Sequence, residues 1–289
     1  VGRSLSVLEA VETAAIVVNA TSGIEPMTQR MMEFARDREL CRLLIVNKID
    51  SRDARCEQLL AEIRETFGRE CLPLNLPRDA GRGVVDCFFK PGNEKPDFST
   101  VDQAHTEIID QVVELDEQLM ALYLEQGEAL SADQLHDPFE RALREGHLVP
   151  VCFVSAETGA GIPELLEILA RLMPNPAEGN PPPFLKGEGP EAERVRVVPD
   201  PNRHVLAHVF KVSIDPFIGK MGIMRVHQGT VRTGAQLFVG DGRRAFKVAH
   251  LYRLQGKEHH EVPYAIPGDI CAIAKVDDLH FDAVVHDSH

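Results

Sequence analysis

Asn47, Lys48 and Asp50 form a short polar group directly after the apolar run from Leu43 to Val46. Such a run is typical of a buried parallel strand, and ligands in open α/β sheets bind outside the carboxyl ends of such strands. The Asp50 carboxylate has two acceptor oxygens, which match the ring N–H and exocyclic amine of guanine but not adenine. The Asn47 amide can bond a base edge and tie neighbouring loops, and the Lys48 stem can lie along the ring. The group therefore predicts a loop that reads guanine.

Ser155 and Ala156 form a second candidate, because they also follow an apolar strand pattern, Val149 to Val154, and precede a helical one. A backbone N–H beside small side chains can approach the oxygen of a base at such a turn. The alternative is that Ser155 simply caps the following helix. The order of the two candidates along the chain favours a shared site.

Elements that would position these residues alternate along the first part of the chain. Apolar strand patterns lie at 15–18, 42–46 and 149–154, and helical patterns begin at Pro26 and cover 56–67 and 163–173. This βαβ alternation predicts an α/β fold with a parallel sheet covered by helices on both faces. Residues 71–147 interrupt it with two short strand patterns and then helical ones. Because residues 102–146 hold 12 acidic side chains and only two basic ones, we expect an acidic helical insertion.

A proline-rich segment at 174–202 separates the sheet region from a different pattern. Beyond it, short β-rich runs alternate with Gly, Asp and Pro turns, which predicts a small β-barrel or sandwich. We therefore expect two domains, 1–173 with an inserted subdomain at 71–147 and an all-β domain at 203–289, joined by a linker at 174–202. A chain of 289 residues fits two domains.

Composition narrows the class of protein. Apolar residues make up 44% of the chain and charged residues 26%, and no apolar run could span a bilayer. Six scattered cysteines fit reduced thiols in the cytoplasm. His259 and His260 lack ligands at metal spacing, so we expect a solvated turn there and no metal site.

Charge is distributed unevenly along the chain. Residues 1–202 have 20 Lys and Arg against 36 Asp and Glu, whereas residues 203–289 have 11 against 9. Residues 203–257 alone hold ten basic side chains and two acidic ones. Such a concentration can contact phosphates locally, or it can be a solvated strand face.

These motifs resemble bacterial elongation factor G. The strand that ends in Asn19 to Pro26, the Asn-Lys-Ile-Asp group at 47–50, Ser155-Ala156 and the large insertion are similar to its GTPase domain. Asp215 to Lys220, Met224 to Val226, Gly229 to Val231 and Pro267 to Ile270 are similar to the barrel that follows. The likeness covers essentially the whole chain. It implies a P-loop-type GTPase domain followed by a translation-factor β-barrel.

The resemblance also implies a function for the parent protein. The parent would bind GTP or GDP with Mg²⁺ and hydrolyse GTP on the ribosome, contacting ribosomal RNA and proteins. We expect Asn47, Lys48, Asp50, Ser155 and Ala156 to bind the nucleotide. No membrane or DNA partner is expected, and we expect a cytoplasmic monomer.

Elements for phosphoryl transfer are missing from the sequence. No Gly-x-x-x-x-Gly-Lys-Ser/Thr loop occurs, since Gly219-Lys220 is followed by Met221. The switch segment and the Asp-x-x-Gly element would lie before Val1. Because the chain also lacks an initiator Met, we expect a fragment with no catalytic residue, no tightly bound cofactor and no GTPase activity of its own.

Two departures from the family pattern leave the role of the parent open. Ile49 stands where the family more often has Met, and Glu157 where it has Phe. The parent is therefore either a translocase, or an elongation factor G-like paralogue with a docking role in regulation or ribosomal protection.

Overall fold

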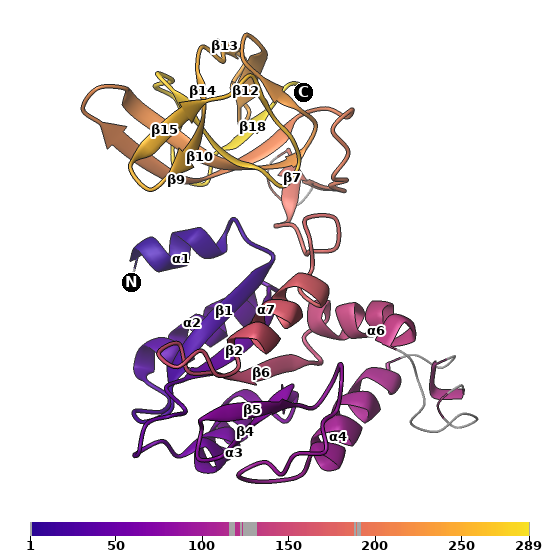
Figure 1. Ribbon diagram of the computed structural model, residues 1–289. Coiled ribbons are helices and arrows are strands. Elements are labelled where there is room, and N and C mark those ends of the chain that lie inside the picture. The colour runs from indigo at the N-terminus through magenta and orange to yellow at the C-terminus, as the bar shows by residue number, and fades with distance from the viewer. Residues whose placement is uncertain are drawn as a thin grey trace. The chain divides into compact units, whose positions relative to one another are not determined.

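The computed structural model describes residues 2–115, 119–121, 123, 132–187, 189 and 192–288, with the backbone alone at 2–4 and 132–136. The chain forms two compact units (Figure 1). Thr13–Pro174 form one, named here the sheet unit, and Val1–Glu12 with Asn175–His289 form the other, named the barrel unit.

The sheet unit is built on four parallel strands. They are β1 (Thr13–Asn19), β2 (Cys41–Asn47), β6 (Val149–Phe153) and β3 (Cys71–Pro73), in the spatial order β1-β2-β6-β3. Strand β6 therefore lies between two strands that precede it by many residues. The predicted α/β fold with a parallel sheet is confirmed.

Helices cover both faces of this sheet, because the middle strands are apolar on both sides. They are α2 (Pro26–Asp37), α3 (Cys56–Phe67), α4 (Val101–Val113), α6 (Ala132–Arg144) and α7 (Ile162–Arg171). On β2, Leu44 and Val46 join one core cluster with residues of α2 and α3. Leu43 of the same strand belongs to the second core cluster, with residues of α4, α6 and α7. Successive side chains of a strand point to opposite faces, so one short strand supports both layers.

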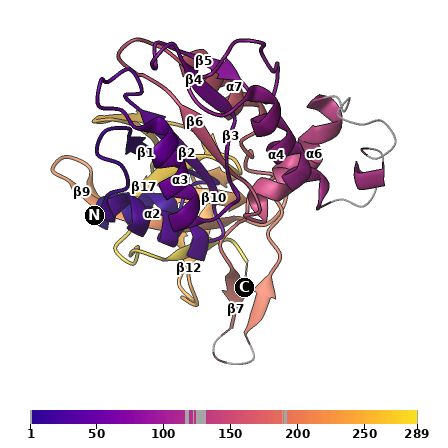
Figure 2. The ribbon, with the colours of Figure 1, turned by 90° about the horizontal axis from the view of Figure 1, so that it is seen from below.

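The inserted segment starts with a hairpin and continues as helices. Strands β4 (Asn75–Arg78) and β5 (Gly83–Asp86) pair antiparallel. The following helix α4 is capped by Thr100, whose Oγ1 accepts a hydrogen bond from the Gln103 amide at 3.1 Å. Helices α4 and α6 lie side by side (Figure 2).

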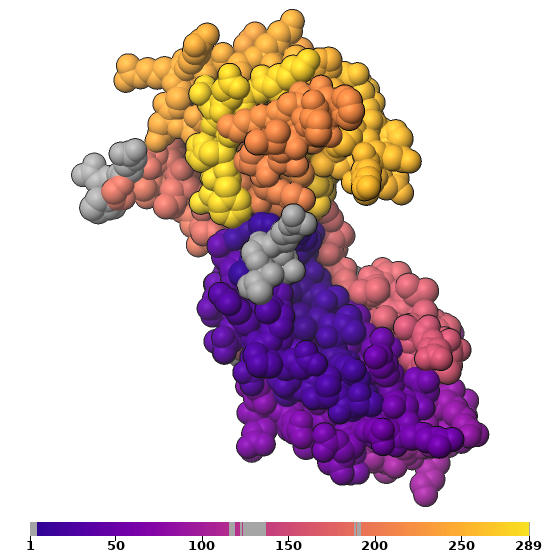
Figure 3. Space-filling view, turned by 90° about the vertical axis from the view of Figure 1, so that its left-hand side faces the viewer, coloured from indigo at the N-terminus to yellow at the C-terminus, as the bar shows by residue number. Residues whose placement is uncertain are grey.

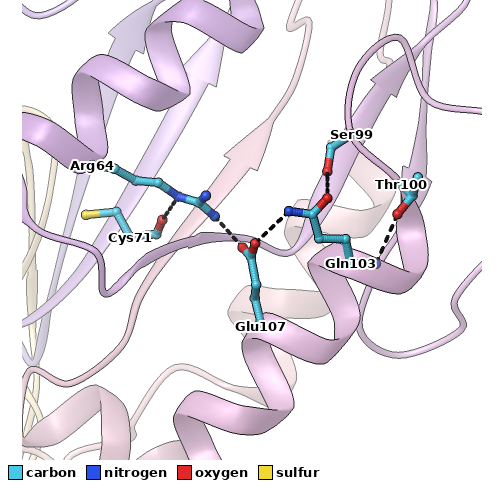
Figure 4. Close-up of polar contacts among 6 residues, drawn as sticks. All are labelled: Arg64, Cys71, Ser99, Thr100, Gln103 and Glu107. Atoms are coloured by element: carbon cyan, nitrogen blue, oxygen red, sulfur yellow. Dashed lines mark hydrogen bonds and ion pairs between the residues drawn. The ribbon is translucent and has the colours of Figure 1, made fainter.

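Helix α4 is also clamped to α3 by a network of polar side chains (Figure 4). The Arg64 guanidinium donates to Glu107 Oε2 at 2.7 Å and to the carbonyl of Cys71 at 3.1 Å. Gln103 donates to the other Glu107 oxygen at 3.0 Å. The insertion is thus fixed to the sheet unit at the start of its first helix.

The barrel unit is an antiparallel sheet in the order β13-β12-β18-β9-β10-β17-β14-β15, with β11 and β16 paired separately. Its two long strands are β9 (Leu206–Asp215) and β10 (Gly219–Gln228). The others are β11 (Val231–Arg232), β12 (Gln236–Val239), β13 (Phe246–Lys247), β14 (Leu251–Gln255), β15 (Glu258–Glu261), β16 (Tyr264–Ala265), β17 (Ile270–Ala274) and β18 (Val284–His286). In Figure 3 the yellow C-terminal residues lie beside the orange ones, as the pairing of β18 with β9 requires. The predicted all-β barrel is confirmed.

His259 and His260 lie on strand β15 and not in a turn. The prediction of a solvated turn was wrong, because the pair continues a hairpin in which Arg253 and Leu254 of β14 face them. His260 is exposed and its Nε2 lies 3.2 Å from Glu258 Oε2.

Two further segments belong to the barrel unit. Helix α1 (Gly2–Leu8) contacts β9, and strands β7 (Phe184–Lys186) and β8 (Glu193–Val195) form a hairpin within the proline-rich segment. Arg225 of β10 is buried and donates to Ala10 O at 3.1 Å and to Glu12 Oε1 at 2.5 Å. One of the ten basic residues counted at 203–257 is therefore not on the surface.

Among the described residues, no helix combines the length and apolar character that crossing a membrane would require.

Candidate functional site

The two predicted loops leave the sheet side by side. Strand β2 ends at Asn47 and β6 ends at Phe153, and in this parallel pair Val46 faces Phe153. The loops that follow therefore share the carboxyl edge of the sheet, where ligands of open α/β sheets bind. The structure brings together the residues that the sequence predicts to act together.

Asn47 connects the two loops through its side-chain oxygen. Oδ1 accepts a hydrogen bond from the Lys48 amide at 2.8 Å and another from the Ala156 amide at 3.0 Å. A second link runs from the amide of Ile49 to the carbonyl of Val154 at 3.3 Å. Because Oδ1 is used within the protein, the Nδ2 amide is the part of Asn47 that can donate to a base.

Lys48 and Asp50 turn outward because Ile49 between them turns inward. Ile49 is 2% exposed and belongs to the core cluster on the α2–α3 face of the sheet. Lys48 adopts a left-handed φ of 66° and its side chain is exposed. The carboxylate of Asp50 has no hydrogen-bond or ion-pair partner in the described part of the chain, so both of its oxygens are available to a ligand.

Ser155 organises the second loop from inside the protein. It is fully buried, its Oγ accepts from the Thr158 amide at 3.2 Å, and its amide donates to Ala160 O at 2.8 Å. The next helix, α7, is preceded by Gly161 at its N-cap position. The alternative interpretation of Ser155 as a helix cap was therefore wrong, since Ser155 closes a turn that leaves Ala156 and its neighbours at the surface.

The inserted hairpin lies against both loops, which the sequence analysis missed. Asn75 of β4 is fully buried, and its side chain bonds the backbone of Phe153 on both sides. Gly81, between β4 and β5, lies against the backbone of Ile49. One signal was present in the sequence, because Asn75 is a polar residue between Leu74 and Leu76 in a strand-like run. Buried polar groups of this kind are almost always hydrogen-bonded.

Thiol chemistry at this edge is disfavoured. Cys56, at the start of α3, is only partly buried, yet burial and then the charge of Asp97 raise the pKa of its thiol to about 11. Burial likewise raises to about 12 the pKa of Cys87, after β5, and of Cys71, which lies at the opposite end of the sheet where β3 begins. The thiolate is the reactive form, so these groups stay inert at neutral pH. The described residues contain no cluster of three His, Cys, Asp or Glu side chains that could hold a metal ion.

Comparison with known proteins gives a consistent picture. Residues 2–175 match the family described as the Elongation factor Tu GTP binding domain, and residues 204–283 match Elongation factor G domain 2. An elongation factor G from Mycoplasma pneumoniae is 29% identical over 96% of this chain and 42% of its own length. An elongation factor G-like protein from Thermotoga maritima is 30% identical over 90% of this chain and 39% of its own length.

Solved structures agree with the sequence comparisons. A crystal structure of a protein from Thermus thermophilus, 29% identical in sequence, superposes with a TM-score of 0.78 over 100% of this chain and 42% of its own. The chain thus spans about two fifths of the length of the relatives it matches, which have 42% and 39% of their lengths covered.

Proposed function

We propose that the parent protein of this chain hydrolyses GTP on the ribosome to drive a step of protein synthesis such as translocation. The chain itself belongs to the elongation factor G-like translational GTPases, and its residues 2–175 match the GTP-binding domain. The observation that carries the proposal is the linked pair of loops at the sheet edge. Asn47 Oδ1 joins them at 3.0 Å, and the Asp50 carboxylate beside this link is unpartnered among the described residues.

Each loop residue has a definite role in this proposal. Asp50 accepts the two N–H groups on the guanine edge, and Asn47 donates its amide to the base while holding the second loop. Lys48 covers one face of the ring with its stem. Ala156 offers its small side chain near the base oxygen, and Ser155 holds that turn in place from below. Asp50 and Asn47 thus fit the guanine edge on the chemistry of their acceptors and donor, while the amides of Ala156 and Ser155 are bonded within the protein and these residues contribute shape.

Affinity for the nucleotide depends strongly on its phosphates and Mg²⁺, which in this family require a glycine loop that the chain does not contain. We therefore propose that the chain alone binds GDP weakly and hydrolyses no GTP. Binding of GDP to this chain alone at micromolar affinity would contradict that statement. The domain bounds at 1–173, 174–202 and 203–289 remain part of this proposal.

The ribosome is the proposed partner, with a cytoplasmic location and a monomeric state. The nine basic residues at 203–257 other than Arg225 supply charge for ribosomal phosphates. The alternative is a docking module of a paralogue with a regulatory or ribosomal-protection role. Exposed Glu157, where the family more often has Phe, favours the alternative. Ile49 does not, because it is 2% exposed and Ile for Met is a nearly volume-conserving exchange in a core.

Substitution of Asp50 by Asn in the native protein, with its own flanking sequence, tests the proposal. An amide in place of the carboxylate loses an acceptor for the exocyclic amine of guanine but can donate to the second oxygen of xanthine. We expect affinity for GDP to fall about 100-fold and affinity for xanthosine diphosphate to rise. Equilibrium titration with fluorescent nucleotides measures both. Unchanged GDP affinity in the variant would exclude the assigned base site.

Ribosome binding separates the two functions. Hydrolysis stimulated by ribosomes supports the GTPase role, whereas ribosome binding without stimulated hydrolysis supports the docking role. Sedimentation with ribosomes at graded salt also tests the contact, because a phosphate-led interaction weakens steeply as salt rises.

A further inference from the structure

The β4–β5 hairpin is part of the inserted segment, yet it lies next to the loops at the carboxyl edge of the sheet. Strand β4 contacts β6, the strand that leads into the second loop (Figure 1). Three separate contacts join the hairpin and the segment after it to the two loops.

The first contact fixes the end of β6. The Asn75 side chain donates from Nδ2 to the Phe153 carbonyl at 3.1 Å and accepts from the Phe153 amide at 2.7 Å. Phe98 adds a ring contact, since its centroid lies 5.8 Å from that of Phe153 in an edge arrangement. The residue from which the second loop departs is therefore held by both its backbone and its side chain.

The second contact fixes the first loop. A Cβ added to Gly81 would lie 2.0 Å from the Ile49 carbonyl oxygen and 3.0 Å from the Asp50 amide, so the two backbones touch. Asp79, Ala80 and Gly81 adopt left-handed φ values of 54°, 57° and 75°. Such a run is costly for residues other than glycine and persists only where the surroundings impose it.

Asp97 imposes this conformation. Its two carboxylate oxygens accept the amides of Ala80 and Gly81 at 3.0 and 3.1 Å, and its own amide donates to Pro77 O at 2.7 Å. Asp97 lies just before α4, which Arg64 and Glu107 clamp to α3 (Figure 4). The loop against Ile49 and Asp50 is thus attached to a fixed part of the sheet unit.

The third contact reaches the end of the second loop. A Cβ on Gly161 would lie 2.3 Å from the Phe153 carbonyl oxygen and 3.2 Å from Val84 Cγ1 of β5. Gly161 also has a left-handed φ of 74°. The hairpin therefore borders both loops, one through its turn and the other through a strand residue.

We infer that Gly81 and Asp97 are positioning residues for guanine recognition, because they fix the backbone from which Asp50 meets the exocyclic amine of the base. The inference rests on the proposed function. Neither residue is assigned a contact with the base. Their effect passes through the Ile49–Asp50 peptide, so it concerns selectivity for guanine more than affinity for the phosphates.

Titration of the native protein with GDP and inosine diphosphate, which lacks the exocyclic amine, tests the inference. Gly81→Ala places a methyl group against the Ile49 carbonyl, so the Asp50 backbone must shift. We expect the preference for GDP over inosine diphosphate to fall about tenfold. Asp97→Ala removes both acceptors and should have a similar effect. Asp97→Asn keeps one acceptor oxygen, so its preference for GDP should lie between those of the wild type and Asp97→Ala.

Gly146→Ala is the matched control. Gly146 also has a left-handed φ of 76° and lies in the sheet unit, but its nearest neighbour is the guanidinium of Arg42 at 3.2 Å and not the backbone of either loop. Hydrogen–deuterium exchange of residues 47–51 provides a second readout without nucleotide. We expect faster exchange in the Gly81 and Asp97 variants than in Gly146→Ala.

The outcomes are distinguishable. If GDP and inosine diphosphate weaken by equal factors, or if Gly146→Ala has the same effect, Gly81 and Asp97 are merely structural and the inference is wrong. If the wild-type protein shows no preference for GDP over ADP, the proposed function fails, and this inference with it.

Discussion

Both units bury a polar side chain to hold a segment in place, but one is neutral and the other is charged. In the sheet unit, Asn75 is 0% exposed and satisfies the backbone of Phe153 beneath the candidate base loops. In the barrel unit, Arg225 is 6% exposed and holds the segment that contains Ala10 and Glu12. The difference matters because removing one partner of a buried ion pair lowers stability more than removing a buried neutral amide does. Hydrophobic burial is non-directional, so polar contacts supply the register of these segments.

The largest effect is expected from Arg225→Met in the barrel unit. Removal of the guanidinium leaves the Glu12 carboxylate, only 22% exposed, without its partner. We expect a loss of about 3 kcal/mol in the free energy of unfolding of this unit, measured by urea denaturation.

The double variant Glu12→Met with Arg225→Met sharpens this result. Replacement of both charges by apolar groups should restore most of the lost stability, since no uncompensated charge remains. Arg203→Met is the control in the same unit, because the Arg203–Asp200 pair is 54% and 42% exposed and should contribute about 0.5 kcal/mol or less. Equal losses in the single and double variants would contradict the ion-pair explanation.

A smaller effect is expected from Asn75→Leu in the sheet unit. Leucine fills the space but leaves the Phe153 amide and carbonyl without partners, so the unfolding free energy should fall by about 2 kcal/mol. Calorimetric unfolding measures the change. Asn93→Leu in an exposed part of the inserted segment is the control and should stay within about 0.5 kcal/mol of the wild type. A loss no larger than that of the control would show that the buried amide does not hold β6.

The smallest effect is a pH dependence of the barrel unit. Burial, and then the charges of Arg225 and His208, lower the pKa of His227 from 6.5 to about 3. The Nε2 of His227 is buried and has no hydrogen-bond partner among the described residues, and the ring packs edge-on against Phe184 at 5.2 Å. Below pH 6.5 the unfolded chain binds a proton at His227 that the folded chain does not bind. The stability contributed by the neutral ring is therefore fully present above pH 6.5 and is lost as pH falls toward 3.

Unfolding at pH 7.5 and 5.5 measures this dependence. The His227 contribution should be a loss of at most about 1.4 kcal/mol over that range. His227→Phe keeps the packing and should flatten the dependence, whereas His260→Gln, at an exposed position, should not. A slope that persists in His227→Phe would assign the effect to another group.

Sequence patterns predicted most of the architecture because its signals are local. Short, nearly continuous apolar runs specified β2 and β6, and Pro26 marked the first residue of α2. The loops after β2 and β6 were predicted because the chemistry of guanine requires particular donors and acceptors at strand ends.

The missed features depend on contacts between residues far apart in sequence. Nothing near Gly81 indicates that Ile49 lies against it, and Asn75 meets Phe153 only in the folded chain. The double histidine at 259–260 was assigned to a solvated turn because no metal ligands lie at suitable spacing, whereas backbone pairing with β14 determines its conformation. The site residues themselves remain a prediction that nucleotide binding must test.

The strand order β1-β2-β6-β3 also constrains how the protein is made. Strand β3 follows β2 in the sequence, yet the place between them belongs to β6, which leaves the ribosome only after the whole inserted segment. Until β6 is made, Asn75 lacks its partner Phe153, and Asn47 in the loop after β2 lacks its partner Ala156. Pairing between strands that lie far apart in the sequence forms late and slowly. During synthesis, the nascent chain therefore has to protect an open sheet edge for the time it takes to translate about 75 further codons, which is about 4 to 15 s at ordinary elongation rates.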